Sequence, residues 1–279
     1  MPGVQVATSR APTAERLAAR KRDRRAPFRR GDGPVRALVL HGLSGSPHEV
    51  RGFATALADL GLAVHAPLLP GHEDLDALAE TTAEAFLTAA ESAFDDLADG
   101  AAHVLVVGFS MGALLALCLC ARRRSQVTAA LCAGTPLWLA RPSQLAIDAL
   151  ARLAGRTRWP HALAPVVKGL PDVRLATEAV SNPGLMAFPA PTLAAFGRLQ
   201  ALARTALPHV TCPLGILHGR HDHTAPVSNA DRLVAAVPSS RVELRILRDS
   251  FHLVGVDLEA DEAVAFVRAF AARTLPAPT

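Results

Sequence analysis

The sequence HVLVVGFSMGALLALCLC, residues 103–120, decides how this chain folds. Its first five residues form an apolar run typical of a buried strand, and residues 113–120 continue as an apolar helical pattern. Between them stands Gly-Phe-Ser-Met-Gly, with Ser110 in a turn too sharp for side chains two positions away on either side. Strand, tight turn and helix in this order predict a nucleophile elbow with Ser110 as the nucleophile. The alternative is a structural turn serine.

On both sides of this stretch, short apolar runs alternate with longer helical patterns, as in a parallel sheet whose crossover connections are helices. The predicted strands are 35–40, 62–66, 103–107, 128–133, 213–218 and 242–247. The predicted helices are 47–60, 82–97, 110–123, 227–237 and 257–272. The sequence therefore predicts an α/β fold with a mainly parallel sheet flanked by helices.

Between residues 135 and 208 this alternation stops. Pro and Gly interrupt helical fragments at 142–153, 173–179 and 192–205, and no strand is convincing there. We interpret residues 135–208 as a helical cap or lid inserted into a core formed by residues 31–134 and 209–279. The alternative is additional helical packing without a lid function.

The first 30 residues form a basic N-terminal tail that is predicted to be flexible. Residues 1–36 carry ten Arg or Lys against three acidic residues, so the net charge of +4 leaves −3 for the rest of the chain. The most basic stretch, 20–25, holds no aromatic residue for base stacking, so no nucleic acid is expected as a partner. A weak contact of this arm with an anionic membrane surface is the alternative to a solvated tail.

The composition of the chain suits a soluble protein. Half of the 279 residues are hydrophobic, yet no apolar run reaches the roughly 18 residues of a membrane span. The N-terminus lacks the apolar segment of a secretory signal, so a cytoplasmic location is expected. Four cysteines suit buried free thiols, and no metal spacing such as Cys-x-x-Cys is present, so no metal is expected: Cys118, Cys120, Cys132 and Cys212.

An elbow serine needs an acid and a histidine at the carboxyl ends of later strands. Asp222 directly follows the apolar run 214–218, and His252 follows 242–247. The three residues stand in the required chain order, and parallel strands place their ligands at that edge. His252 would accept the proton of Ser110, while Asp222 would orient the imidazole. Four neighbours fit structural roles better: His221, His223, Asp249, and Asp257 as the N-cap of the last helix.

The negative oxygen of a tetrahedral intermediate needs aimed N–H donors. The candidates are the backbone amides of Met111, which follows the nucleophile, and of Leu43, in the turn His-Gly-Leu-Ser-Gly-Ser-Pro at 41–47. His41 is interpreted as a structural hydrogen-bonding residue. The glycine-rich turn lacks both Gly-x-Gly-x-x-Gly and the Walker lysine, so phosphate binding is not indicated.

Four motifs together resemble a known family: residues 41–47, residues 108–112, Arg220-His221-Asp222 and Ser250-Phe251-His252. From about Arg36 to the C-terminus the chain is similar to the bacterial carboxylesterase and monoacylglycerol lipase group of α/β-hydrolases. The resemblance implies an α/β-hydrolase fold with the helical cap inserted after the sixth strand. It further implies a serine esterase without a cofactor, which hydrolyses short- to medium-chain acyl esters or monoacylglycerols through an acyl-enzyme on Ser110.

Two segments depart from that family. Gly71-His72-Glu73 stands where Gly-His-Gly is common, and residues 167–172 show no polar residue that matches those holding glycerol. An esterase is therefore favoured over a strict monoacylglycerol lipase. Other chemistries of the same fold, namely thioester hydrolysis, carbon–carbon bond hydrolysis and perhydrolysis, remain as alternatives, as does a non-catalytic ligand-binding protein.

The expected partner is a small ester with an apolar acyl group, bound beneath the cap. The apolar candidates for its pocket are Trp138, Leu139, Trp159, Leu163, Val166, Val167, Leu185, Met186 and Phe188. The polar candidates are His161, Lys168 and Asn182. For each of these residues, ordinary core packing or a solvated surface is the competing interpretation.

Overall fold

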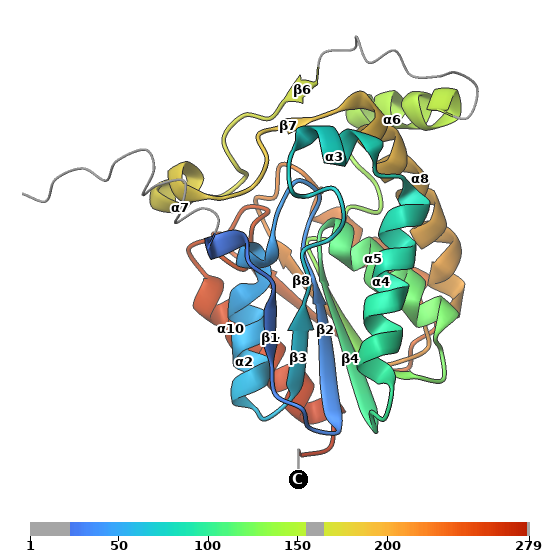
Figure 1. Cartoon of the computed structure of the whole chain (residues 1–279), viewed down its shortest axis with the longest axis vertical. Coiled ribbons are helices and arrows are strands. Elements are labelled where there is room, and N and C mark those ends of the chain that lie inside the picture. Colours follow the sequence, from blue (N-terminus) through green and yellow to red (C-terminus); the bar gives the residue numbers. More distant parts are fainter. Residues whose placement is uncertain (1–22, 155–164, 278–279) are drawn as a thin grey trace, which may run out of the picture.

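A computed structural model describes residues 23–154 and 165–277. Its centre is a seven-stranded sheet with the order β1-β3-β2-β4-β5-β8-β9 (Figure 1). All neighbouring strands run parallel except β1, which pairs antiparallel with β3. The strands are β1 (Phe28–Arg30), β2 (Val35–Leu40), β3 (Ala63–Ala66), β4 (His103–Phe109), β5 (Val127–Ala133), β8 (Leu214–Gly219) and β9 (Val242–Leu247). The predicted mainly parallel α/β fold is confirmed.

The sheet is buried on both faces because its inner strands are apolar at nearly every position. Successive side chains of a strand point to opposite faces, so Ala37 and Val39 of β2 enter one core while Leu38 and Leu40 enter the other. Strands buried on both sides read as continuous apolar runs, which is the pattern of β2 and β4.

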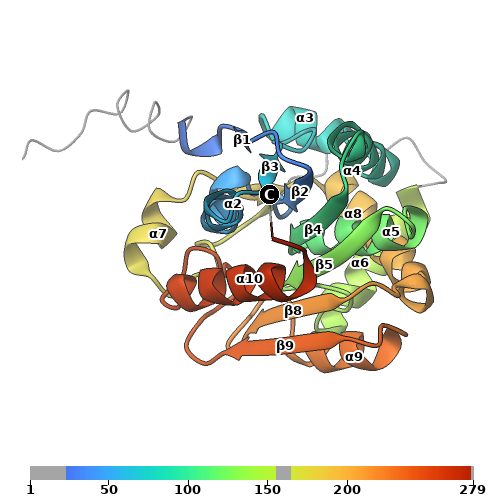
Figure 2. The same ribbon diagram turned by 90° about the horizontal axis from the view of Figure 1, so that it is seen from below.

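Helices cover both faces (Figure 2). On one face α2 (Arg51–Asp59), which follows the short 3₁₀ helix η1 (Pro47–Val50), packs against α10 (Ala260–Thr274). On the other face lie α4 (Ala83–Ala98), α5 (Met111–Arg122) and α9 (Ser228–Ala236). The side chain of Thr82 caps the first turn of α4 by accepting a hydrogen bond from the Ala85 N–H. A short helix that the sequence did not predict, α3 (Leu75–Glu80), precedes α4.

The chain between β5 and β8 first lies over the carboxyl ends of the strands, and its long helix α8 (Ala190–Ala206) then returns beside α4 and α5 (Figure 1). It holds α6 (Arg141–Ala154), β6 (Val166–Val167), α7 (Ala176–Ser181), β7 (Ala187–Phe188), α8 (Ala190–Ala206) and the 3₁₀ helix η2 (Leu207–His209). The expectation that this segment has no strand was wrong, since β6 and β7 pair as a two-stranded antiparallel ribbon. The expected position after a sixth strand is not confirmed: within the described residues the segment follows β5, which is the fifth strand there.

The predicted tail of residues 1–30 extends too far. Residues 1–22 lie outside the described part of the chain, but residues 28–30 form β1 at the edge of the sheet. Arg24 reaches the segment above the sheet, where it donates to Glu178 Oε2 at 2.7 Å and to the Ser181 carbonyl at 2.7 Å. Arg24 is therefore part of the folded structure, because it is paired with a side chain of a distant segment.

Candidate active site

Ser110 occupies the tight turn between β4 and α5. Its φ of 54° and ψ of −118° lie in the left-handed half of backbone space, where a non-glycine residue is strained. A Cβ at Gly108 would collide with the Gly112 carbonyl, and a Cβ at Gly112 would collide with the Leu40 carbonyl. Both glycines are therefore required by the close approach of the chain, and the predicted elbow geometry is confirmed.

Asp222 and His252 stand beside this serine, as the loop positions predicted. Asp222 follows β8 and His252 follows β9. His252 Nδ1 lies 2.7 Å from Asp222 Oδ2, and His252 Nε2 lies 2.9 Å from Ser110 Oγ. With its proton on Nδ1, the imidazole presents Nε2 as an acceptor for the serine hydroxyl. The arrangement is that of a nucleophile, a base and an orienting acid.

The Asp222 carboxylate is fully buried and receives four hydrogen bonds. The backbone N–H groups of Thr224 and Ala225 donate to Oδ1 at 2.9 and 2.6 Å. Oδ2 lies 2.7 Å from His252 and 3.1 Å from His218 Nε2. Burial raises the pKa of Asp222, but the charge of His252 and the bonds from His218 and His252 outweigh it and hold the pKa below its usual range. Asp222 is consequently an anion at neutral pH.

His218 is a residue that the sequence interpretation missed. It is the fifth residue of β8, fully buried, and its Nε2 also lies 2.9 Å from the Ala225 carbonyl. Both of these neighbours are oxygen acceptors, so His218 Nε2 carries the proton. The sequence did offer a sign of this role, because a histidine stands inside an otherwise apolar strand, four residues before Asp222.

Three carboxylates raise the pKa of His252. Burial lowers the pKa of His252, while Asp222, Asp172 and Glu49 raise it, and the net result is a pKa above the usual value. Asp172 belongs to the segment above the sheet, and Glu49 belongs to η1. An imidazolium is thus stabilised at this position.

Of the two predicted oxyanion donors, Met111 belongs to the elbow and Leu43 to a loop beside it. Met111 is the first residue of α5, so its N–H has no acceptor within the helix. The loop with Leu43 passes directly beside the nucleophile: a Cβ at Gly42 would lie 3.1 Å from Ser110 Cβ. The N–H groups that follow Leu43 are used inside the protein, that of Ser44 by His72 Nε2 at 3.1 Å and that of Gly45 by the Gly42 carbonyl at 3.1 Å. Leu43 N–H stays the predicted donor of this loop for a reacting oxygen.

Two buried histidines brace this loop as hydrogen-bond acceptors. His41 Nε2 accepts from the Leu69 N–H at 2.9 Å, which matches the predicted structural role of His41. Burial lowers the pKa of His72 to about 4, and the pKa of His41 is lowered by burial and by the neighbouring His72. Both rings are therefore neutral at physiological pH. Glu73, the unusual residue beside His72, is exposed and places no charge in the site.

Glu49 lies beneath the same loop and was not predicted. The Gly42 backbone lowers the pKa of its carboxyl, and a Cβ at Gly45 would collide with it. Among the described residues Glu49 Oε2 has no hydrogen-bond partner, although it is buried. Burial raises the pKa of Glu49 and outweighs the opposite effect of Lys168. Glu49 follows the predicted loop by two positions, and a glutamate in the first turn of a buried segment was the available signal.

A cavity of about 310 Å³ opens onto Ser110 and His252. Its apolar lining comes mainly from residues above the sheet, namely Leu139, Ile147, Leu170, Phe188, Leu193 and Phe196. Its polar lining is Glu49, Ser143, Lys168, Asp172, His223 and Thr224. Residues 167–172 thus contribute two polar side chains to the cavity, Lys168 and Asp172.

Few of the predicted pocket residues line this cavity. Leu139, Phe188 and Lys168 do, whereas Trp159, His161 and Leu163 lie outside the described residues. Asn182 is buried but donates to Glu178 Oε1 at 3.2 Å. The remaining predicted residues, Trp138, Val166, Val167, Leu185 and Met186, are not part of the lining.

The rival acids and histidines take structural positions. His221 and Asp249 are exposed, and Asp249 accepts from the Arg174 guanidinium at 3.1 Å. His223 is exposed, but its Nδ1 lies 2.8 Å from Asp172 Oδ1. Asp257 is not the N-cap of the last helix, because α10 begins three residues later and Glu259 takes the N-cap position. The Asp257 carboxylate accepts backbone N–H groups of two other segments instead.

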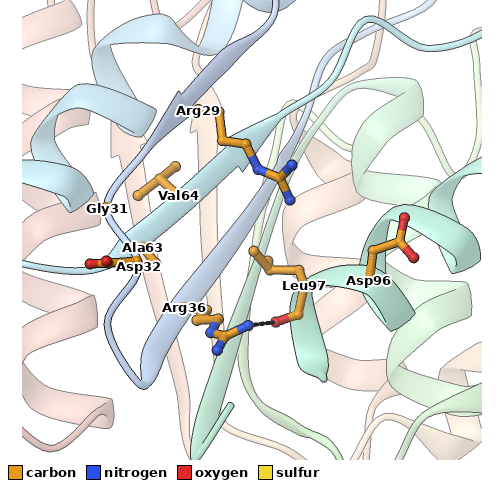
Figure 3. A pocket seen from close by; sticks show the side chains of 8 residues that line it. All are labelled: Arg29, Gly31, Asp32, Arg36, Ala63, Val64, Asp96 and Leu97. Atoms are coloured by element: carbon orange, nitrogen blue, oxygen red, sulfur yellow. Dashed lines mark hydrogen bonds between the residues drawn. The ribbon is translucent and has the colours of Figure 1, made fainter. Parts of the chain in front are cut away.

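A second hollow, of about 260 Å³, lies at the amino ends of the strands (Figure 3). Its side chains include Arg29, Asp96 and Arg36, and the last donates to the Leu97 carbonyl at 2.9 Å. Because Arg36 also binds the Asp99 carbonyl, it caps the end of α4 and is not free to hold a ligand. The chemistry of the molecule is thus concentrated at the opposite edge of the sheet.

Within residues 23–154 and 165–277, no group of three or more His, Cys, Asp or Glu side chains is placed to hold a metal ion. In the same part of the chain, no helix is long and apolar enough to cross a membrane. All four cysteines are free, and Cys120 Sγ lies 3.8 Å from Cys212 Sγ.

Comparison with known proteins adds a family to this geometry. The model of one family, described as serine aminopeptidase, S33, matches residues 34–259. The match includes Leu43, Ser110, Met111, Asp222 and His252, the residues predicted for the site.

Two curated relatives and one solved structure are similar over most of the chain. The thermostable monoacylglycerol lipase of Bacillus sp. (strain H-257) is 30% identical over 243 residues, which are 84% of this chain and 88% of that protein. The pimeloyl-[acyl-carrier protein] methyl ester esterase of Aromatoleum aromaticum is 30% identical over 234 residues, 74% of this chain and 86% of the relative. A structure from work on the metagenome-derived lipolytic enzymes LipS and LipT has 25% identity and a TM-score of 0.78, covering 88% of this chain and 98% of the other.

Proposed function

The chain belongs to the serine aminopeptidase S33 family of α/β-hydrolases, and from this premise we propose that it is a serine hydrolase that cleaves carboxylic esters. One observation carries the proposal: His252 is within hydrogen-bond distance of Ser110 Oγ on one side and of Asp222 Oδ2 on the other. A role in ligand binding alone would not require this connected set of a hydroxyl, an imidazole and a carboxylate.

In the proposed reaction Ser110 Oγ attacks the ester carbonyl and its proton passes to His252 Nε2. The carbonyl oxygen becomes negative and receives hydrogen bonds from the N–H groups of Leu43 and Met111, each worth about 3 kcal/mol of the barrier. When the tetrahedral intermediate collapses, the bond to the alcohol oxygen breaks and His252 gives its proton to that oxygen. A water molecule, deprotonated by His252, then hydrolyses the acyl-enzyme and restores Ser110.

For the substrate we propose an ester with a short- to medium-chain acyl group and a hydroxyl-bearing alcohol. The apolar side of the cavity, with Phe188, Leu193 and Phe196, suits an acyl chain, and about 310 Å³ is near the lower end of ligand pockets. On the polar side, Glu49 Oε2 is an unused acceptor and the Lys168 ammonium is a donor. A monoacylglycerol, the substrate named for the Bacillus relative, has both parts. Residues 135–208 would then serve as the cap that encloses the acyl chain.

A hydrolysis assay and a labelling experiment test the proposal. We expect turnover of p-nitrophenyl acyl esters and of monoacylglycerols, and stoichiometric labelling of Ser110 by a fluorophosphonate. Ser110→Ala should lose both while it keeps the fold measured by circular dichroism. Folded wild-type protein that neither hydrolyses these esters nor takes the label would overturn the proposal. Acyl thioesters and aminoacyl anilides in the same assay separate ester hydrolysis from the other chemistries of this fold.

For the surroundings of the enzyme we propose the cytoplasm, where the four free thiols would persist, and a weak contact of the basic arm with anionic lipid. Because Arg24 and residues 28–30 belong to the folded part, the test is a deletion of residues 1–22. The deletion should abolish binding to phosphatidylserine vesicles in low salt. Binding that is unchanged would show that the arm makes no such contact.

A further inference from the structure

Asp172 belongs to the segment above the sheet, between β6 and α7, yet its carboxylate binds the loop of the proposed catalytic acid. Oδ2 accepts the backbone N–H groups of His223 and Thr224, both at 3.0 Å, and the Thr224 hydroxyl at 2.8 Å. Oδ1 lies 2.8 Å from His223 Nδ1. The two residues that supply these four contacts directly follow Asp222 in the chain. The carboxylate of Asp172, which comes from another segment, therefore binds both residues that follow Asp222.

Asp172 and Asp222 share one of these donors. The Thr224 N–H lies 2.9 Å from Asp222 Oδ1 and 3.0 Å from Asp172 Oδ2, as in a three-centre hydrogen bond. The peptide that orients Asp222 is itself held by Asp172. A change at Asp172 would alter the direction in which Asp222 faces His252, although Asp172 is not hydrogen-bonded to either of them.

The same segment holds the loop of His252. The Leu253 N–H, directly after His252, donates to the Asp172 carbonyl at 3.1 Å. On the other side, the Phe251 N–H donates to Asp257 Oδ2 at 2.7 Å. Asp257 Oδ1 in turn accepts the N–H groups of Arg174 and Leu175 at 2.9 and 3.0 Å. Both chain neighbours of His252 are thus fastened to residues 172–175, one directly and one through Asp257.

We propose that Asp172 is a positioning residue for ester hydrolysis, which fixes the loops of Asp222 and His252 relative to each other from the segment above the sheet. This inference rests on the hydrolase function proposed above. Hydrolysis needs Ser110, His252 and Asp222 in a single alignment, and an error of about 1 Å can cost about a hundredfold in rate. Backbone hydrogen bonds from both loops to one short segment supply that alignment.

Besides its hydrogen bonds, Asp172 acts on His252 through its charge. His252 faces the carboxylates of Asp222, Asp172 and Glu49, and the second of these contributes to its raised pKa. Asp172 itself faces His223 at 2.8 Å and the Lys168 ammonium, on which its charge also acts. Removal of the Asp172 charge should therefore lower the pKa of His252, a change that a purely structural residue would not cause.

The test is Asp172→Asn, which keeps the shape of the side chain but removes its charge and one acceptor oxygen. Initial rates on a p-nitrophenyl ester are normalised to sites titrated with a fluorophosphonate, so that only folded enzyme is counted. We expect kcat to fall at least tenfold with KM changed less than about threefold. The acidic limb of the kcat/KM profile should move to lower pH. Asp148→Asn, in α6 and hydrogen-bonded to Gln144, is the matched control and should leave both unchanged.

A second variant covers the case in which Asp172→Asn does not fold. Thr224→Val removes only the hydroxyl donor to Asp172 Oδ2 and should lower kcat in the same direction by a smaller factor. A folded Asp172→Asn variant with wild-type kcat per titrated site and a wild-type pH profile would show that Asp172 has no positioning role. If only Thr224→Val folds, a wild-type kcat for that variant would show the same. A wild-type enzyme without ester hydrolysis or labelling would instead overturn the hydrolase function, and the role of Asp172 with it.

Discussion

Lys168 Nζ donates a hydrogen bond to Ser44 Oγ over 3.0 Å, which joins the segment above the sheet to the loop that carries Leu43. The same loop is held from that side a second time, since the Leu185 N–H donates to the Ser44 carbonyl at 2.6 Å. Ser44 has a φ of 58° and therefore needs such contacts to keep its left-handed conformation. The loop of the proposed oxyanion donor is thus held by Lys168 and Leu185 from the segment above the sheet, in addition to its bond with His72.

We predict that Ser44→Ala lowers kcat by about tenfold or more. A hydrogen bond between a hydroxyl and a buried ammonium contributes about 1.5–3 kcal/mol, and its loss frees the loop of Leu43. Steady-state kinetics on a p-nitrophenyl ester measure the effect. Ser239→Ala removes a hydroxyl far along the chain that binds the Cys212 carbonyl, and should leave kcat unchanged. Equal values of kcat for the two variants would contradict the role of the Lys168–Ser44 contact.

Glu49→Gln should move the acidic limb of the kcat/KM profile to lower pH. The reaction requires neutral His252, whose pKa is raised in part by the charge of Glu49, so activity is lost as the pH falls through that value. Removing the negative charge lowers the pKa of His252 and extends activity into more acidic solution. A profile measured from pH 4 to 9 shows the shift, with Glu91→Gln on α4 as control. A limb that stays in place or moves upward would be inconsistent with this electrostatic role.

Gly112→Ala should destabilise the protein by at least about 1–3 kcal/mol, because the new Cβ would collide with the Leu40 carbonyl of the neighbouring strand. Chemical denaturation measures the free energy of unfolding. Gly169→Ala is the matched control: apart from Gly169 and its chain neighbours, no atom of the described residues lies within 4 Å of a Cβ there, so we expect a change within about 0.5 kcal/mol. If Gly112→Ala is as stable as the control, the tight packing of the elbow is not as described.

Arg24→Met should loosen the connection between the N-terminal region and α7. Arg24 binds Glu178, whose side chain is only 10% exposed, and Arg24 also lies 2.5 Å from His48 Nε2. Leaving this carboxylate with one partner fewer costs about 1–3 kcal/mol, measured by thermal unfolding. Arg30→Met removes an ion pair with Asp59 that is about half exposed, so its effect should stay near zero. Equal losses in the two variants would show that Arg24 makes only a surface contact.

The catalytic candidates could be predicted because strict geometry restricts them to few positions. The elbow needs small residues around Ser110, and the acid and the histidine must follow later parallel strands, so their places in the sequence are nearly fixed. Six strands of the sheet were also predicted close to their observed limits. The apolar runs of these strands and the 3.6-residue period of the longer helices are each visible within one segment of the chain.

What the sequence did not predict depends on contacts between distant segments. β1 has only three residues, two of them arginines, and becomes a strand only because β3 lies beside it. Glu49, His218 and Asp172 look like ordinary polar residues until the loops around Ser110 come together. The β6–β7 ribbon is equally invisible, since two residues on each side carry no alternating pattern.

The order of the elements along the chain has a consequence for biosynthesis. A ribosome releases β5 and residues 135–208 before it makes β8, β9 and the loops that follow them. Residues 172–175 therefore lack their partners in the loops after β8 and β9 until those loops have emerged. A growing chain holds Ser110 before it holds Asp222 and His252, so the proposed hydrolysis can begin only after β9 and the loop that follows it have been made.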